Sequence, residues 1–224
     1  MPDRCQLYYI TDRSQFPGDE LARRRALLAK VAEAASAGID YIQLREKDLS
    51  GRELETLARE SAHIIQNPGN NRRPRTRLLI NSRTDIALAV GADGVHLRSA
   101  DVSPATVRAL SEEAAASGSP LAHRNLVVAV SAHAASDVRR AAAEGADFVV
   151  FAPVFEKRGA PQIQATGLAA LREACTSKIP VFALGGVTLE NAPLCLAAGA
   201  AGVAGIRLFQ EQKIEDVVVR LRSR

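Results

Sequence analysis

Short apolar runs alternate with longer amphipathic stretches from one end of the chain to the other. The runs are short and bounded by turn residues, as is typical of buried strands. We predict strands over residues 6–11, 41–44, 78–81, 94–97, 126–131, 148–151, 181–184 and 202–206. The stretches between them carry apolar residues at helical spacing, and we predict helices over 21–37, 51–66, 84–90, 103–117, 135–144, 168–175, 189–198 and 214–221.

A sequence repeat shows how many strand–helix units the chain contains. Gly38, Gly91, Gly145 and Gly199 each begin a short turn that leads into a strand, at offsets of 53, 54 and 54 residues. A glycine in this position is typical of a helix C-terminus. Because a period of this size holds two strand–helix units, four periods make the eight units of a (β/α)8 TIM barrel. An open, doubly wound sheet would also alternate, but it gives no reason for a fourfold repeat.

We therefore predict one α/β domain, a single TIM barrel over residues 1–224, and the composition agrees with this prediction. The chain is 47% hydrophobic and 24% charged, which is ordinary for a soluble globular protein. Cys5, Cys175 and Cys195 show neither a disulfide framework nor zinc spacing, which favours a reducing compartment. The sequence shows no secretion signal and no apolar run of transmembrane length. We expect a cytoplasmic protein with no membrane partner.

A basic loop raises the question of nucleic-acid binding. Arg72, Arg73, Arg75 and Arg77 fall within a loop of Pro, Gly and Asn that connects a helix to the next strand. That connection lies on the barrel face opposite the expected site, so we interpret the loop as a solvated turn. The chain has no Trp and only 4% aromatic residues, which disfavours stacking on nucleic-acid bases. We predict no nucleic-acid partner.

Polar residues gather where the predicted strands end. In TIM barrels the chemistry takes place at the carboxyl ends of the strands and in the loops that follow. The opposite ends of the strands carry mostly Gly, Ala and Asp turns, so the asymmetry indicates function. The residues at the strand ends are Thr11-Asp12-Arg13, Gln43, Arg45, Lys47, Asn81-Ser82-Arg83, His96, Arg98, Asp101, Ser131, His133, Lys157, Arg158, Gly185-Gly186 and Arg207.

Two groups of these residues fit anions. Gly185-Gly186 follows the seventh strand and Arg207 ends the eighth, and these two loops form the usual phosphate site of the fold. A glycine pair alone is as often a tight turn as a phosphate cup, but here its position favours phosphate, because the backbone N–H groups can approach an anion closely. Arg45 and Lys47, from the second strand, suit a second anionic or polar group.

Two histidines lie at strand ends. His133 follows Ser131 by two residues, and because an imidazole titrates near neutrality we take His133 as a candidate general acid or base. A lone histidine is more often structural, and we assign that role to His96, which we expect to serve in packing.

Five segments of the chain resemble the thiamine-phosphate synthase/TenI superfamily in their order and spacing, and the resemblance runs nearly end to end. They are Tyr9-Ile10-Thr11-Asp12, Gln43-Leu44-Arg45-Glu46-Lys47, Gly91-Ala92-Asp93-Gly94-Val95-His96-Leu97, Val130-Ser131-Ala132-His133 and Ala183-Leu184-Gly185-Gly186-Val187-Thr188. The resemblance implies a (β/α)8 barrel that acts in thiamine biosynthesis. Members of this superfamily are often oligomeric, so it also leaves a homo-oligomer open.

The resemblance implies roles for the residues if the chain is a synthase. That branch joins hydroxymethylpyrimidine diphosphate to a thiazole phosphate with Mg²⁺ and releases diphosphate. In this interpretation Asp101 binds the metal and Ser131 contacts the pyrimidine, while Gly186 and the end of the eighth strand hold the thiazole phosphate. The residues expected to hold the pyrimidine diphosphate are Gln43, Arg45, Lys47 and Asn81.

Two departures from the synthase pattern concern the same task, the stabilisation of a departing diphosphate. Synthases have Asn-Asp after the third strand, whereas this chain has Asn81-Ser82, and a hydroxyl is a poor substitute for a carboxylate on Mg²⁺. The synthase loop after the sixth strand carries threonines that embrace diphosphate, and residues 155–161 contain none. A third difference is Arg207, which stands where synthases have Ser.

TenI-type relatives share these departures and isomerise a thiazole carboxylate phosphate to its aromatic tautomer, with the residue matching His133 as the acid/base and with no cofactor. We take this thiazole tautomerase as the leading hypothesis, with the Mg²⁺-dependent synthase as the alternative and a non-catalytic sensor of thiazole or thiamine phosphates as a third. The predicted catalytic residues are His133, Arg45 and Lys47. The predicted substrate-binding residues are Gln43, Asn81, Ser131, Gly185, Gly186 and Arg207, and Asp101 is a metal ligand only in the synthase alternative.

Overall fold

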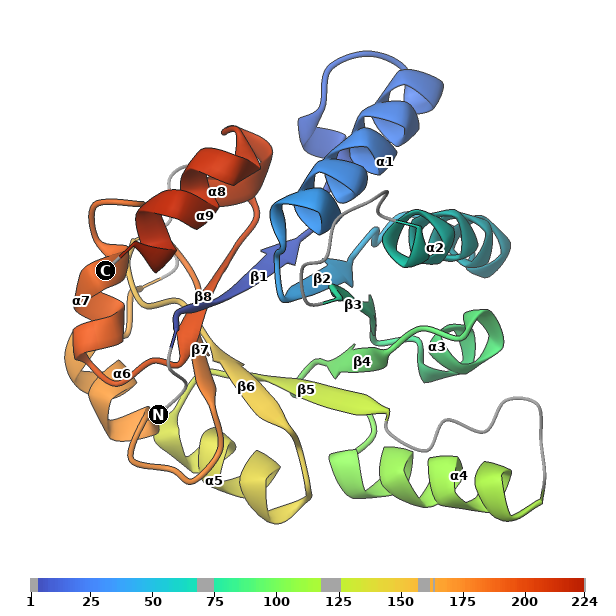
Figure 1. Cartoon of the computed structure of the whole chain (residues 1–224). Helices are drawn as coiled ribbons and strands as arrows, with labels where there is room; N and C mark the ends of the chain where they lie inside the picture. The colour runs from blue at the N-terminus through green and yellow to red at the C-terminus, as the bar shows by residue number, and fades with distance from the viewer. Residues whose placement is uncertain (1–3, 68–74, 118–125, 157–161, 163, 224) are drawn as a thin grey trace.

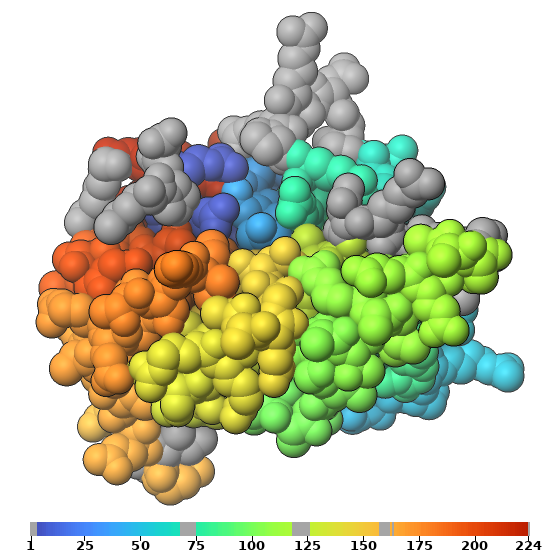
Figure 2. Space-filling view, turned by 90° about the horizontal axis from the view of Figure 1, so that it is seen from below, coloured from blue at the N-terminus to red at the C-terminus, as the bar shows by residue number. Residues whose placement is uncertain are grey.

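The strands form a closed parallel barrel, as the repeat predicts. The computed structural model describes residues 4–67, 75–117, 126–156, 162 and 164–223, and its eight strands are hydrogen-bonded in chain order, with β8 closing on β1. Helices surround the barrel (Figure 1), and on one face of the surface the orange, yellow and green segments follow one another in order (Figure 2). The strands are β1 Gln6–Ile10, β2 Tyr41–Leu44, β3 Arg77–Asn81, β4 Gly94–Leu97, β5 Val127–Ala132, β6 Phe148–Phe151, β7 Val181–Ala183 and β8 Gly202–Gly205.

The helices match the predicted ranges within about three residues, and two short elements, η1 and α8, are additions to them. The helical elements are η1 Arg13–Gln15, α1 Glu20–Ala37, α2 Gly51–Gln66, α3 Thr84–Val90, α4 Pro104–Ala116, α5 Ala135–Ala143, α6 Gly167–Ala174, α7 Ala192–Ala197, α8 Arg207–Gln210 and α9 Ile214–Arg222. Helix α7 begins three residues later than predicted because the Asn191 side chain accepts a hydrogen bond from Thr188 N–H at 2.8 Å and forms a turn there. Within the described residues no helix is long and apolar enough to cross a membrane.

Aromatic rings fill the part of the barrel interior that is nearer the amino ends of the strands. Tyr8, Tyr41, Phe148 and Phe182 pack with ring centroids 4.8–5.9 Å apart, distances at which aromatic pairs are favourable. A second, larger apolar cluster lies between the strands and the helices. Because these rings close the barrel near the amino ends of the strands, space for a ligand remains at the carboxyl ends.

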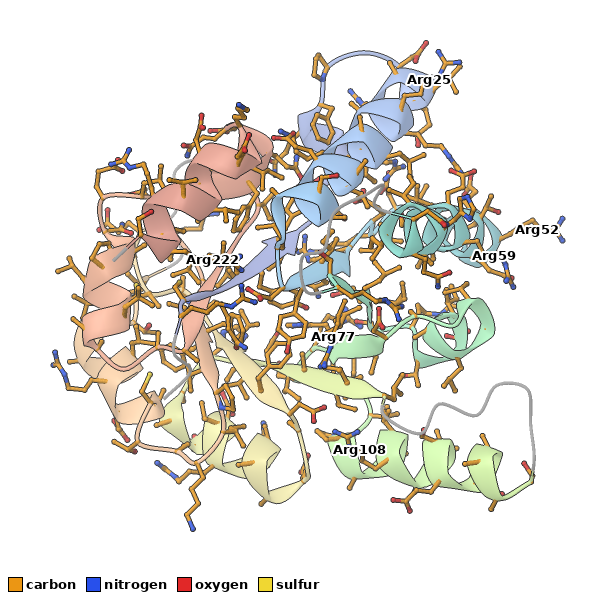
Figure 3. All side chains as sticks on the ribbon, viewed as in Figure 1. Arg25, Arg52, Arg59, Arg77, Arg108 and Arg222 are labelled. Atoms are coloured by element: carbon orange, nitrogen blue, oxygen red, sulfur yellow. The ribbon has the colours of Figure 1, made fainter. Side chains whose placement is uncertain are left out.

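The repeated glycines and aspartates hold the opposite end of the barrel together. The four glycines adopt positive φ angles of 81°, 65°, 83° and 103°, a conformation that glycine adopts at low cost. Asp40, Asp93 and Asp147, which belong to the same repeat, accept the backbone N–H groups of Leu7, Leu78 and Val128 at 2.8, 2.9 and 2.6 Å. Each of these carboxylates also pairs with an arginine, and Arg108 and Arg222 are labelled in Figure 3.

Replacing Asp40 by alanine should destabilise the barrel. The mutation removes the acceptor for Leu7 N–H and the partner of the Arg222 guanidinium, which lies 2.6 Å from the carboxylate. We expect a loss of about 2–3 kcal/mol in the free energy of unfolding, measured by urea denaturation. Asp40→Asn keeps an acceptor and should lose less. Equal stability of the alanine variant and the wild type would contradict this role.

Candidate active site

A cavity of about 550 Å³ opens at the carboxyl ends of the strands. It brings together all nine residues predicted to bind or transform the substrate. These are Gln43, Arg45, Lys47, Asn81, Ser131, His133, Gly185, Gly186 and Arg207. Their roles remain predictions, but the structure places them around one hollow. Two other predicted strand-end residues, Lys157 and Arg158, lie outside the described residues, as do Arg72 and Arg73 of the basic loop.

The end of β2 presents two cations to the cavity and turns an acid away from it. Arg45 and Lys47 line the cavity, whereas the Glu46 side chain between them is only 1% exposed. Glu46 Oε1 accepts the Thr11 hydroxyl at 2.6 Å, and Glu46 Oε2 accepts Arg13 N–H at 3.0 Å and the Arg13 guanidinium at 3.2 Å. Thr11 Oγ1 in turn accepts Arg45 N–H at 3.0 Å. This buried network therefore fixes the backbone that carries both cations.

The pKa values in this network follow from burial and its compensation. Burial raises the pKa of Glu46, and the hydrogen bonds from Thr11 and Arg13 oppose that rise. Burial likewise lowers the pKa of Arg45, and the charges of Asp12 and Glu46 act against that change. The sequence analysis identified the motif of residues 43–47 but did not predict that the Glu46 side chain turns away from the cavity. The alternation of side chains along a strand is the signal that could have shown it.

Changing Glu46 to glutamine should be strongly destabilising. Whichever way the amide turns, its NH2 group meets either the Thr11 hydroxyl hydrogen or the donors of Arg13, and the guanidinium loses the buried one of its carboxylate partners while keeping Glu20 and Asp48. We expect the free energy of unfolding to fall by about 1–3 kcal/mol, the cost of a buried polar group left unsatisfied, read from urea denaturation. Glu20→Gln is the matched control, because Glu20 contacts the same guanidinium at 2.7 Å but has a 60% exposed side chain. That variant should lose less than about 1 kcal/mol, and equal losses would show that burial of Glu46 is unimportant.

His96 differs from its predicted role as a packing residue. It lines the cavity, and its two ring nitrogens are hydrogen-bonded on opposite sides. His96 Nδ1 lies 3.0 Å from the Tyr8 hydroxyl and His96 Nε2 lies 2.8 Å from Ser131 Oγ. Burial, assisted by the nearby charge of Arg45, lowers the pKa of His96 to about 3, so the ring is neutral at physiological pH. Its neighbours Val95 and Leu97 belong to the outer apolar cluster, and strand alternation could have shown that His96 faces inward.

The His133 ring is held by a backbone carbonyl at one of its two nitrogens. Its Nδ1 lies 2.7 Å from the Ala152 carbonyl oxygen, and since a carbonyl only accepts hydrogen bonds, Nδ1 must carry the hydrogen. The lone pair of the neutral ring therefore belongs to Nε2. His133 N–H donates to Asp137 Oδ2 at 3.0 Å, which ties the end of β5 to the start of α5. The position of this lone pair is what a general base requires.

The backbone of residues 155–156 packs closely against the glycine pair that follows β7. Gly185 and Gly186 have φ angles of 95° and 63°, where glycine is favoured. A Cβ atom at Gly186 would clash with the Glu156 carbonyl oxygen. Asn191 Nδ2 donates to the Gly186 carbonyl at 2.9 Å and holds this peptide. Arg207 lines the cavity as the first residue of α8, rather than as the end of β8, and a short extra helix here is typical of barrels that bind phosphate.

The carboxylate predicted to bind a metal is held in an ion pair. Asp101 lies beside Arg98, which donates to its carboxylate through the backbone N–H at 2.7 Å and through Nη2 at 2.9 Å. Burial pushes the pKa of Asp101 up, but the bonds from Arg98 and the Ser82 hydroxyl outweigh it and leave the pKa below its usual value. Within the described residues no three His, Cys, Asp or Glu side chains are grouped as metal ligands. Mg²⁺ is commonly held by one or two carboxylates together with substrate phosphates, so in the synthase alternative Asp101 would have to exchange its bonds from Arg98 for the metal.

The fold and the cavity define a (β/α)8 barrel with one polar, cationic site at the carboxyl ends of its strands. The chain belongs to the thiamine monophosphate synthase family, whose family model matches residues 7–209. This confirms the resemblance found in the sequence and the place of the chain in thiamine biosynthesis.

Individual relatives agree with the family. The chain is 44% identical over 202 residues to a protein of Geobacter sulfurreducens named "Putative thiamine-phosphate synthase", covering 88% of this chain and 83% of that one. It is 35% identical over 224 residues to the thiamine-phosphate synthase of Syntrophomonas wolfei, covering 97% and 94%. Among solved structures it is similar to thiamine phosphate pyrophosphorylase from Pyrococcus furiosus, with 27% identity, a TM-score of 0.76 and coverage of 97% and 94%. These names favour the synthase alternative over the tautomerase hypothesis.

Proposed function

We propose that the cavity binds a thiazole phosphate, with its phosphate at Gly185, Gly186 and Arg207 and its other polar end at Arg45 and Lys47. The proposal is supported by the two groups of anion-binding residues that line one cavity. Backbone N–H groups at positive-φ glycines suit phosphate oxygens, and a guanidinium suits a carboxylate. The family membership supports the same class of ligand.

Two reactions share this ligand. The names of the relatives support condensation with a pyrimidine diphosphate, the reaction of a thiamine-phosphate synthase. That reaction must stabilise the charge of a departing diphosphate, and Asp101, the carboxylate expected to bind its Mg²⁺, is engaged by Arg98, while Ser82 replaces the second carboxylate of the synthase pattern. We therefore propose the second reaction, a proton transfer within the thiazole carboxylate phosphate, as the activity.

The observation that carries the proposal is that His133 lines the cavity with its Nδ1 bonded to the Ala152 carbonyl, which leaves Nε2 as the nitrogen able to accept a proton. In the proposed reaction His133 Nε2 takes a proton from one carbon of the substrate, and the electrons of the broken C–H bond move into the ring system. The imidazolium that forms keeps its Nδ1–H bond to the Ala152 carbonyl. It then returns a proton at a second carbon, which leaves the aromatic tautomer and the neutral histidine, so no atom is gained or lost.

Two assays run side by side test the proposal. The first follows conversion of the thiazole carboxylate phosphate to its aromatic tautomer by NMR in the presence of EDTA, and the second follows diphosphate release from the pyrimidine diphosphate and thiazole phosphate with Mg²⁺. We expect conversion in the first and none in the second. Robust, Mg²⁺-dependent diphosphate release without tautomerisation would establish the synthase. Thermal stabilisation by the ligands without turnover in either assay would establish a sensor.

A further inference from the structure

A row of three hydrogen-bonded polar side chains crosses the barrel beneath the cavity. Tyr8 of β1 contacts His96 of β4, and His96 contacts Ser131 of β5, at 3.0 and 2.8 Å. Tyr8 is fully buried and His96 is 3% exposed, and the row reaches the cavity at His96 and Ser131, which both line it. The row thus connects the floor of the barrel to a group that a ligand can touch.

The direction of the hydrogen bonds in this row follows from counting protons. A neutral imidazole carries one hydrogen and one lone pair on its two ring nitrogens. Burial keeps the Tyr8 phenol protonated by raising its pKa well above the ordinary value. Within the described residues the hydrogen-bond partner of the phenol oxygen is His96 Nδ1, and the Tyr8 ring belongs to an apolar cluster. The phenol must therefore donate to Nδ1, because a buried donor without an acceptor is strongly disfavoured.

The proton count then extends to the cavity. With its lone pair on Nδ1, His96 carries its hydrogen on Nε2 and donates it to Ser131 Oγ. Ser131 accepts that bond, so its own hydroxyl hydrogen is available for a group in the cavity. The opposite direction, with Ser131 donating to His96, would leave the Tyr8 hydroxyl without an acceptor among aromatic rings.

We propose that Tyr8 and His96 are positioning residues that fix Ser131 as a hydrogen-bond donor to the substrate. His133, two residues further along the chain, offers an acceptor at Nε2. The end of β5 therefore presents a donor and an acceptor two residues apart at the cavity, which selects a ligand with an acceptor atom, such as a ring nitrogen or carboxylate oxygen, a few bonds away from an acidic C–H. The assignment of the donor rests on the structure alone, whereas its use in catalysis rests on the proposed function.

The tautomer of His96 can be measured without any substrate. We would label the histidines with ¹⁵N, record long-range ¹H–¹⁵N spectra of the wild type, and assign His96 by its loss in His96→Gln. The proposal predicts a hydrogen on Nε2 and a lone pair on Nδ1. A hydrogen on Nδ1, or on both nitrogens, would overturn it, and this outcome does not depend on Tyr8 variants folding.

Tyr8→Phe removes the hydroxyl that sets the direction of the hydrogen bonds from Tyr8 through His96 to Ser131. Tyr41→Phe is the matched control. Tyr41 belongs to the same ring cluster, with its ring centroid 5.9 Å from that of Tyr8, but its hydroxyl is not part of the hydrogen-bonded row. Tyr8→Phe should mix or reverse the His96 tautomers, and Tyr41→Phe should leave them unchanged. Identical tautomers in all three proteins would show that Tyr8 does not set the direction.

The catalytic consequence is tested with a double-mutant cycle on the tautomerisation rate. Tyr8→Phe should lower kcat/KM about tenfold, the value of one hydrogen bond, and should have no further effect in a Ser131→Ala background. Independent, additive losses would mean that Tyr8 acts other than through Ser131 and would overturn the positioning role. If no turnover is found but the His96 tautomer is as predicted, the proposed function fails and the assignment of Ser131 as a donor stands.

Discussion

Replacing His133 by glutamine should lower the rate of thiazole tautomerisation by about 10²–10⁴-fold, the usual contribution of a positioned acid/base. Glutamine is similar in length but cannot take up a proton at neutral pH. Among the described residues the ring makes one side-chain hydrogen bond, to Ala152, so the fold should be retained. The measurement is kcat for conversion to the aromatic tautomer, with thermal unfolding recorded for the same samples.

The matched control for this variant is His63→Gln. His63 is an exposed histidine on α2, and its replacement should leave the rate within about twofold, as for a surface substitution away from the site. If His133→Gln retained the wild-type rate while remaining folded, the acid/base would have to be another group and the proton transfer through His133 Nε2 would be wrong.

Replacing Gly186 by alanine should weaken both phosphate binding and the fold. The new Cβ atom would clash with the Glu156 carbonyl oxygen and would lie 2.8 Å from Phe155 Cβ, and these contacts are too short to be accommodated without movement of the backbone. The positive φ of 63° adds strain of about 1–2 kcal/mol. With overpacking included, we expect the free energy of unfolding to fall by about 2–4 kcal/mol and the affinity for thiazole phosphate to fall at least about tenfold, measured by urea denaturation and calorimetric titration.

Gly145→Ala separates backbone strain from the effect on the site. Gly145 has a similar φ of 83°, but nothing lies within 4 Å of the Cβ that alanine would add. This variant should lose only the strain of about 1–2 kcal/mol and should bind thiazole phosphate as the wild type does. Equal losses of affinity in the two variants would contradict a phosphate site at Gly186.

The fold could be predicted because its information is local and repeated. Strand-length apolar runs, helix-terminal glycines and a period near 54 residues determine the number of units, and closure into a barrel follows from that number. The site could be predicted for a related reason. Parallel strands in a barrel all end on one face, so polar residues at strand ends must meet there even when they are far apart in sequence, as Arg45 and Arg207 are.

What could not be predicted depends on contacts between strands that are distant in sequence. The tautomer of His96 is set by Tyr8, which lies 88 residues away and across the barrel, and no local pattern records that pairing. Strand alternation could have shown that Glu46 turns away from the cavity, but not that Thr11 and Arg13, which follow β1, are its partners. The pairing of Asp101 with Arg98 is local, three residues apart, but the choice between metal and guanidinium as its partner is a matter of side-chain geometry.

A crystal structure of the complex with the thiazole carboxylate phosphate would show whether one cavity holds both anionic ends of the substrate beside His133. We expect the phosphate at Gly185, Gly186 and Arg207, the carboxylate near Arg45 or Lys47, and the reacting carbon within about 3–3.5 Å of His133 Nε2, the distance of a near-attack geometry. A phosphate bound elsewhere in the barrel, or a reacting carbon out of reach of His133, would contradict the proposed tautomerisation.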